Sequence, residues 1–271
     1  MDITWAKALG WRLGRQLLDP VGSSSVAEVV GQLGAVPSWP DPTPQVSIGM
    51  RRSRDRPGDL SRALASGAVL RAYAFRGAVH VLTPATAGRY LVLRAIGRQW
   101  ELPSWQEAYQ LSPAQWPDFR AAIRDALADG PLTREQLRAV VRRKGRFATA
   151  ADGLGSQSDT LLKALMWQGD ACFGPIVDGV VTVQALAAVS GWKGLPDVDV
   201  AGRQAVIEYV RVFGPTTPER LRYYLGSGLS TGPALRRWLA DVEDRLVSVD
   251  IEGEAALVLA EDVDSLASAT A

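Results

Sequence analysis

The sequence predicts an α+β protein, mainly helical with small β-hairpins, built from tandem winged-helix units. Two observations lead to this fold class. Segments with helical spacing of apolar residues run into a short alternating segment three times along the chain, which is the element order of a helix-turn-helix followed by a β wing. In addition, a similar nine-residue sequence precedes a predicted helix in two of these segments. With 271 residues, 47% of them hydrophobic, the chain is long enough for two or three compact units.

The first winged-helix unit is expected over residues 1–100. Trp5, Leu9 and Leu13 recur every four residues, and a serine run before Val26 offers an N-cap to the next helix. Prolines between 37 and 44 exclude a continuous helix there. The alternation around Gly77 predicts a β-hairpin. We therefore expect helices in the first 35 residues, at about 44–51 and at about 58–66, and a hairpin over 69–82.

The second and third units are expected over 112–188 and 200–262. Gly130-Pro-Leu-Thr-Arg-Glu-Gln-Leu-Arg138 repeats as Gly214-Pro-Thr-Thr-Pro-Glu-Arg-Leu-Arg222, and Thr133 to Gln136 has capping-box spacing. Asp178-Gly179 and Glu252-Gly253 are typical hairpin turns. We expect helices over 119–127, from 133, over 161–167 and 206–213, from 218 and over 235–242, hairpins over 171–183 and 245–259, linkers near 100–117 and 190–202, and a tail over 263–271.

The composition excludes several functions. One cysteine and one histidine allow neither an intrachain disulfide nor a zinc site of the usual kind, and no glycine-rich phosphate loop is present, so no metal and no cofactor are expected. No apolar run reaches the roughly 18 residues of a membrane span, and the N-terminus lacks a secretory signal. We expect a cytoplasmic monomer. Gly228-Leu-Ser-Thr-Gly232 resembles a nucleophile elbow, but the only histidine lies upstream, so Ser230 is interpreted as an N-cap.

Arginines in three places are candidate DNA contacts. A net charge of +1 argues against unspecific coating of nucleic acid, and a solvated charged surface is the alternative interpretation of each cluster. Neutralising Arg142, Arg143 and Lys144 is predicted to reduce salt-dependent duplex binding. The candidate residues are Arg51, Arg52, Arg54, Arg142, Arg143, Lys144, Arg146, Arg236 and Arg237.

The chain resembles the bacterial winged-helix DNA-binding family that includes the AlkZ/YcaQ-like alkylpurine DNA glycosylases. Four motifs carry the resemblance in order: Arg76-Gly-Ala-Val-His80-Val-Leu82, Gly130-Pro-Leu-Thr133, Phe173-Gly-Pro175 and Gly214-Pro-Thr-Thr217. The resemblance implies a C-shaped array of winged helices around duplex DNA. It also implies hydrolysis of the N-glycosidic bond of alkylated, often bulky purines, sometimes as self-protection. Members usually continue into a β-rich C-terminal segment, so this chain is expected to be shortened.

The family's catalytic motif is degenerate here. The resemblance implies a water held by Gln-x-Gln or Gln-x-Asp after the second helix. The two possible registers, Val36-Pro-Ser38 and Pro37-Ser-Trp39, contain neither a glutamine nor a carboxylate. Ser38, Asp41 and His80 remain as candidates, and a lone histidine on a strand is more often structural than catalytic.

Three functions stay open from the sequence. The first is a duplex DNA-binding protein on a glycosylase-like scaffold that lacks strong activity, because the glutamines are absent. The second is an active alkylpurine DNA glycosylase with a rearranged water site. The third is a protein-interaction or ligand-sensing scaffold without a DNA role, which the near-neutral charge favours.

Overall fold

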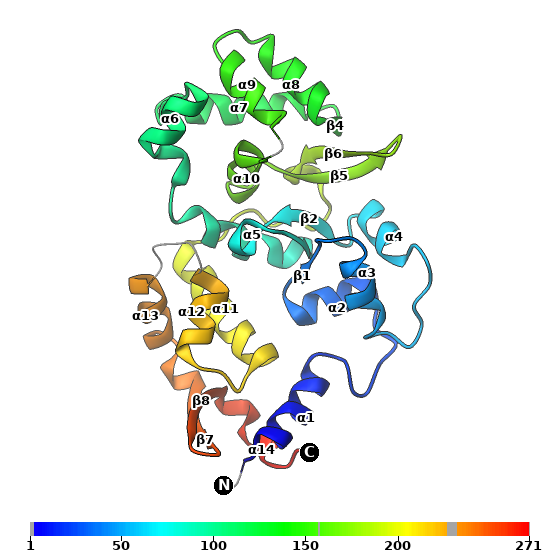
Figure 1. Cartoon of the computed structure of the whole chain (residues 1–271), viewed down its shortest axis with the longest axis vertical. Coiled ribbons are helices and arrows are strands. Elements are labelled where there is room, and N and C mark those ends of the chain that lie inside the picture. Colours follow the sequence, from blue (N-terminus) through cyan, green and yellow to red (C-terminus); the bar gives the residue numbers. More distant parts are fainter. Residues whose placement is uncertain (1–2, 157, 227–231, 271) are drawn as a thin grey trace.

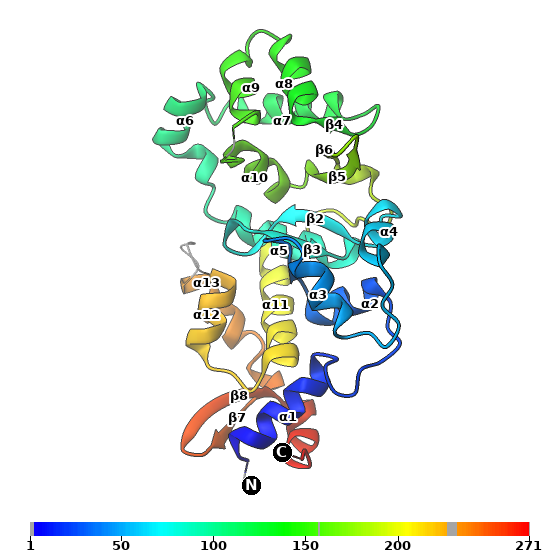
Figure 2. The ribbon, with the colours of Figure 1, turned by 45° about the vertical axis from the view of Figure 1, so that its right-hand side comes forward.

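The chain folds mainly into α-helices with small antiparallel sheets, as a computed structural model shows (Figures 1 and 2). The structure describes residues 3–156, 158–226 and 232–270. The predicted α+β fold class is confirmed. Ser230 and most of the 228–232 motif lie outside the described residues.

The N-terminal third contains four helices, one hairpin and one long following helix. Ser25 caps α2 in a capping box with Glu28, which satisfies two backbone donors at the helix start. The hairpin is interrupted at its loop by a short 3₁₀ turn, Phe75–Gly77, in which Arg76 has a φ of 52°. The elements are α1 (Trp5–Arg15), α2 (Val26–Leu33), β1 (Val36–Pro37), α3 (Thr43–Gly49), α4 (Asp59–Ala65), β2 (Leu70–Tyr73), β3 (Val79–Leu82) and α5 (Pro84–Ala95).

The middle third forms the upper part of Figure 1. The predicted capping box is present, because Thr133 accepts from the Gln136 amide and the Gln136 side chain accepts from the Thr133 amide. The elements are α6 (Pro103–Tyr109), α7 (Trp116–Ala126), β4 (Leu132–Thr133), α8 (Arg134–Arg142), α9 (Ala148–Leu154), α10 (Thr160–Trp167), β5 (Ala171–Val177) and β6 (Val180–Ala185).

The C-terminal third returns to the lower part of the molecule, where α1 and α14 lie together (Figure 1). Arg12 of α1 fixes this arrangement by donating to the carbonyl oxygens of Gly214 and Pro215, at 3.3 and 3.0 Å. The elements are α11 (Val198–Phe213), α12 (Pro218–Gly226), α13 (Gly232–Ala240), β7 (Leu246–Ile251), β8 (Glu254–Leu259) and α14 (Val263–Ala267).

The first two hairpins belong to one sheet. Its order is β1-β3-β2-β5-β6-β4, and β2 joins β5 through the pairing of Arg71 with Phe173. The third hairpin, β7-β8, forms a separate two-stranded sheet. One hydrophobic core runs from Ala35 to Val242, with smaller cores around α2 and around α1. The predicted winged-helix units therefore share a core, and their boundaries stay a prediction.

Several helices were not expected from the sequence. Helix α5 has a signal that could have revealed it, since Thr83 accepts from the Thr86 amide and Pro84 stands at the first helical position. Helix α6 lies inside the predicted linker 100–117, and α14 lies inside the predicted tail, where Leu266 is fully buried. Short helices of this kind are fixed by packing and carry little periodicity.

The contact between α11 and α13 depends on Gly202. A Cβ atom on this residue would lie 2.1 Å from the ring of the buried Trp238. We expect Gly202→Ala to lower the free energy of unfolding by about 2 kcal/mol, because overpacking forces the ring or the helix to move. The matched control is Gly31→Ala in α2, whose Cβ would meet Thr83 at an ordinary 3.7 Å. Urea unfolding of both variants checks the prediction, and equal stabilities would contradict it.

Candidate nucleic-acid interface

Most arginines of the described residues are paired with carboxylates. On α8, Arg138 and Arg142 both bind Asp152, and on α7, Arg120 and Arg124 both bind the buried Asp170. A cation that is neutralised by a neighbouring carboxylate attracts phosphate less than a free one. The unpaired cations therefore indicate where an anionic polymer would bind.

The first predicted cluster lies on the segment after α3 and is largely structural. Arg51 is buried, and its Nε and Nη1 atoms donate to the carbonyl oxygens of Gln16 and Ser47, at 2.8 and 2.5 Å. Arg52 binds Asp55 and Asp59 at 2.9 and 2.8 Å. Arg54 is exposed and has no partner among the residues that the structure describes.

The second cluster follows α8 and is mostly compensated. Arg142 binds Asp152 at 2.5 Å and Lys144 binds Asp125 at 3.2 Å. The remaining pair joins Arg146 to Asp118 at 3.0 Å. Arg143 is exposed without a carboxylate partner in the described ranges. Contact of this cluster with DNA stays a prediction.

The third cluster lies on α13. Arg237 forms an ion pair with Asp199 of α11, while Arg236 is exposed with no carboxylate partner in the described part of the chain. Of the nine predicted contacts, Arg54, Arg143 and Arg236 can thus meet phosphate without first breaking an ion pair or a side-chain hydrogen bond to another described residue.

A surface that the sequence analysis missed lies between the first hairpin and α12. Arg76, in the hairpin loop, donates to the Tyr223 hydroxyl at 2.7 Å and stacks on its ring with 5.0 Å to the centroid. Leu221 and Leu225 are buried, whereas Arg220, Arg222 and Tyr223 of α12 are exposed. Arg76, Arg220 and Arg222, here called the α12 arginine surface, have no carboxylate partner among the described residues.

The degenerate catalytic motif begins on β1, which pairs with the β3 strand of the hairpin that carries Arg76. Val36 pairs with Val81 and is fully buried, and Pro37 pairs with His80. Side chains alternate along a strand, so Pro37 shares a face with His80 whereas Val36 enters the core around α2. A buried valine cannot hold a water, because it offers no polar atom.

Trp39 and Ser38 follow β1. Trp39 is 77% exposed, and the Ser38 amide donates to the Val79 carbonyl at 2.8 Å. Asp41 is exposed and close enough to Arg71 for its charge to raise the pKa of that arginine, although burial lowers this pKa more strongly. The Asp41 carboxylate therefore lies near Arg71 of β2.

His80 is buried and points toward the aromatic residues under the hairpin loop. Its ring contacts Phe75 edge-on at 5.2 Å, and its Nδ1 donates to the Ala78 carbonyl at 3.0 Å. Burial, opposed by this hydrogen bond and assisted by the charge of Arg76, lowers the pKa of His80 to about 4. The imidazole is thus neutral at pH 7, and its Nε2 is an acceptor of hydrogen bonds.

Aromatic residues pack against Phe75 of the hairpin loop. Phe75 contacts both Tyr90 and Tyr224, with centroid distances of 4.5 and 4.6 Å. The Tyr90 hydroxyl donates to Glu208, which also binds Arg89. This network joins α5 to α11 and fixes the position of the loop that carries Arg76.

The described residues contain no group of three or more histidine, cysteine, aspartate or glutamate side chains that could hold a metal ion. Cys172 is buried, and burial raises the pKa of its thiol to about 12. None of the helices described here combines the length and the apolar character needed to cross a bilayer.

Helices followed by small β-hairpins, with exposed arginines near a hairpin loop, are features that DNA-binding winged-helix proteins share. The chain matches the family described as DNA glycosylase AlkZ-like over residues 30–271, and it belongs to that family. The resemblance noted from the sequence is confirmed.

Two comparisons extend this assignment. The chain is 31% identical to an interstrand DNA cross-link repair glycosylase of Streptomyces sahachiroi over 270 residues, which cover 99% of this chain and 73% of that protein. The solved structure of the Streptomyces sahachiroi DNA glycosylase AlkZ is similar with a TM-score of 0.92 and 30% identity, covering 100% of this chain and 73% of that one.

Proposed function

We propose that this protein binds duplex DNA and hydrolyses the N-glycosidic bond of alkylated purines. The observation that carries the proposal is the α12 arginine surface, because its three cations have no carboxylate partner among the described residues of a chain of net charge +1, and one of them, Arg76, is close enough to His80 for its charge to lower the pKa of that histidine. The family and the two relatives support a glycosylase over a protein that only binds DNA. Its cytoplasmic location and monomeric state stay predictions.

The chemistry of the substrate explains how a site without the glutamines can act. An alkylated purine is cationic and leaves readily, so the protein must mainly orient a water and stabilise an oxocarbenium-like sugar. His80 pairs with Pro37 of the degenerate motif and is neutral at pH 7, so its Nε2 can accept a hydrogen bond from the water. The phosphates on either side of the lesion would be held by the α12 arginine surface.

Release of free base tests the proposal. A duplex with a single N7-alkylguanine is incubated with an excess of protein, and the released base is measured by chromatography. We expect release above the spontaneous rate for at least one adduct among methyl and larger alkyl groups. Release at the spontaneous rate for every adduct, from protein that binds the duplex, would support the alternative of a binding protein without activity.

A second measurement separates His80 from the arginines. His80→Phe keeps the ring volume but removes the acceptor, and it is expected to lower the single-turnover rate about 10- to 100-fold with duplex affinity changed less than about threefold. Loss of affinity equal to the loss of rate would contradict the role assigned to His80.

A further inference from the structure

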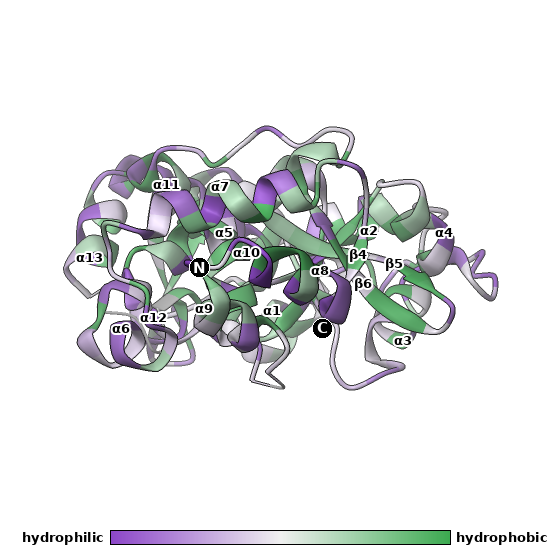
Figure 3. Ribbon diagram, turned by 90° about the horizontal axis from the view of Figure 1, so that it is seen from above, coloured by the Kyte–Doolittle hydropathy of each residue, from purple (hydrophilic) through white to green (hydrophobic). Residues whose placement is uncertain are grey.

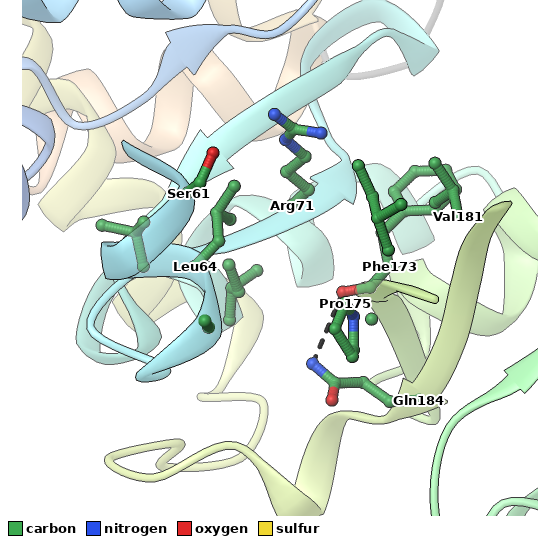
Figure 4. Close-up of a pocket in the computed structure, with 12 residues that line it drawn as sticks. Ser61, Leu64, Arg71, Phe173, Pro175, Val181 and Gln184 are labelled. Atoms are coloured by element: carbon green, nitrogen blue, oxygen red, sulfur yellow. Dashed lines mark hydrogen bonds between the residues drawn. The ribbon is translucent and has the colours of Figure 1, made fainter. Parts of the chain in front are cut away.

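A cavity of about 300 Å³ lies on the other side of the sheet, between α4 and the β5-β6 hairpin. Its walls are apolar, with Leu64 on α4 and Phe173, Pro175, Ile176 and Val181 on the hairpin. Figure 4 shows Arg71 between Ser61 of α4 and Phe173 of β5. Ligand sites of proteins typically combine an apolar lining of this size with a few polar groups.

Arg71 is the one charged residue of this lining. Its Nε atom is buried and has no hydrogen-bond partner, and no carboxylate of the described residues forms an ion pair with it. A buried donor without a partner destabilises the folded protein, and a ligand that accepts its hydrogen bond would remove this penalty. Arginine stays cationic in proteins, so that ligand atom is expected to be anionic.

Apolar side chains of the hairpin are exposed, both in the lining of the cavity and next to it. Ile176 is 62% exposed, Val180 is 49% exposed and Val181 is 38% exposed. Hydrophobic residues continue toward the end of this hairpin, which projects from the body of the protein (Figures 1 and 3). The register of β5 against β6 shifts between Phe173 and Ile176, and Pro175 of this irregular segment lines the cavity. Exposed apolar side chains grouped around a cavity indicate a binding surface.

We propose that this cavity binds an apolar group that carries, or lies next to, one anionic oxygen group, with the apolar part between Leu64 and Phe173 and the anion on Arg71. This chemistry can come from a free carboxylic or sulfonic acid, or from an apolar substituent of a DNA base next to a phosphate. The cavity is separate from the α12 arginine surface, so the inference does not require the glycosylase activity.

Two related dyes test the proposal on the intact protein without DNA. 1-Anilinonaphthalene-8-sulfonate is anionic, and N-phenyl-1-naphthylamine is its uncharged counterpart. We expect Leu64→Trp, which fills the cavity, to weaken binding of both dyes at least 10-fold. Arg71→Met keeps the length of the side chain and is expected to weaken only the anionic dye, by about 10-fold or more. Val46→Trp, on an exposed position of α3, is the control for an added tryptophan.

The results separate the possible outcomes. Unchanged dye binding in Leu64→Trp, or equal loss of both dyes in Arg71→Met in a protein with unchanged melting temperature, would overturn the proposal. With dye binding confirmed, release of bulky and methyl adducts by Leu64→Trp identifies the source of the ligand. Slower release of the bulky adduct alone assigns the cavity to substituted DNA, whereas unchanged release of both assigns it to a free acid. If no adduct is released by any protein, the proposed function fails while the dye result stands.

Discussion

Replacing Arg76, Arg220 and Arg222 by alanine is expected to weaken duplex binding roughly 100-fold at about 0.1 M salt. The three side chains have no carboxylate partners among the described residues, so their removal leaves no unpaired acid and removes up to three phosphate contacts. Each contact releases condensed counterions, and the slope of log Kobs against log salt should fall by about 0.9 for each one lost. Fluorescence anisotropy at four salt concentrations measures both quantities.

The matched comparison is the triple variant Arg142→Ala, Arg143→Ala and Lys144→Ala, which loses the same charge from the surface predicted in the sequence. Two of its members are already paired with Asp152 and Asp125, so we expect a smaller loss of affinity and of slope. A larger loss in this variant than in the α12 variant would place the DNA on α8 and contradict the assignment of the α12 arginine surface.

The second large effect is expected in the dependence of stability on pH. His80 has a pKa of about 4 in the folded protein, against about 6.5 in an unfolded chain. Between these values the unfolded state binds more protons, so the free energy of unfolding falls as the pH is lowered through this window. The loss is about 2 kcal/mol between pH 7 and pH 5 and about 3 kcal/mol in total. Above about pH 7 the contribution of His80 is constant.

The chain has one histidine, and no other side chain of ordinary pKa titrates between pH 5 and 8. A change of stability over this pH range can therefore be assigned to His80. Urea unfolding of the parent and of His80→Phe at pH 7 and pH 5 isolates the effect. The difference between the two proteins should change by about 2 kcal/mol between the two pH values. A difference independent of pH would show that His80 is not buried in its neutral form.

Local signals in the sequence determined the secondary structure well. The turns at Asp178-Gly179 and Glu252-Gly253 join β5 to β6 and β7 to β8, and the capping box at Thr133 begins α8, as predicted. These features depend on residues close in the sequence, where the backbone conformation and the nearest hydrogen bonds decide the outcome. The family and the degenerate motif could also be predicted from the sequence, because both are recognised by comparing residue types at given positions.

The candidate site depended on contacts between distant segments. The sequence showed Arg142, Lys144 and Arg146 as a basic cluster, but carboxylates from α7 and α9 compensate all three. Arg76 appeared only as part of a hairpin motif, and its place beside Tyr223 of α12 required the packing of the hairpin loop on that helix.

Most of the helices, the three hairpins and the absence of glutamines from β1 could be predicted from the sequence, since each follows from the order of residues within a short segment, whereas α5, α6 and α14 were missed. Folding was needed to show that two hairpins share one sheet, that Val36 is buried and that Arg76, Arg220 and Arg222 have no carboxylate partner among the described residues. The physical reason is that charge compensation and burial depend on distances between atoms that folding brings together from remote parts of the chain.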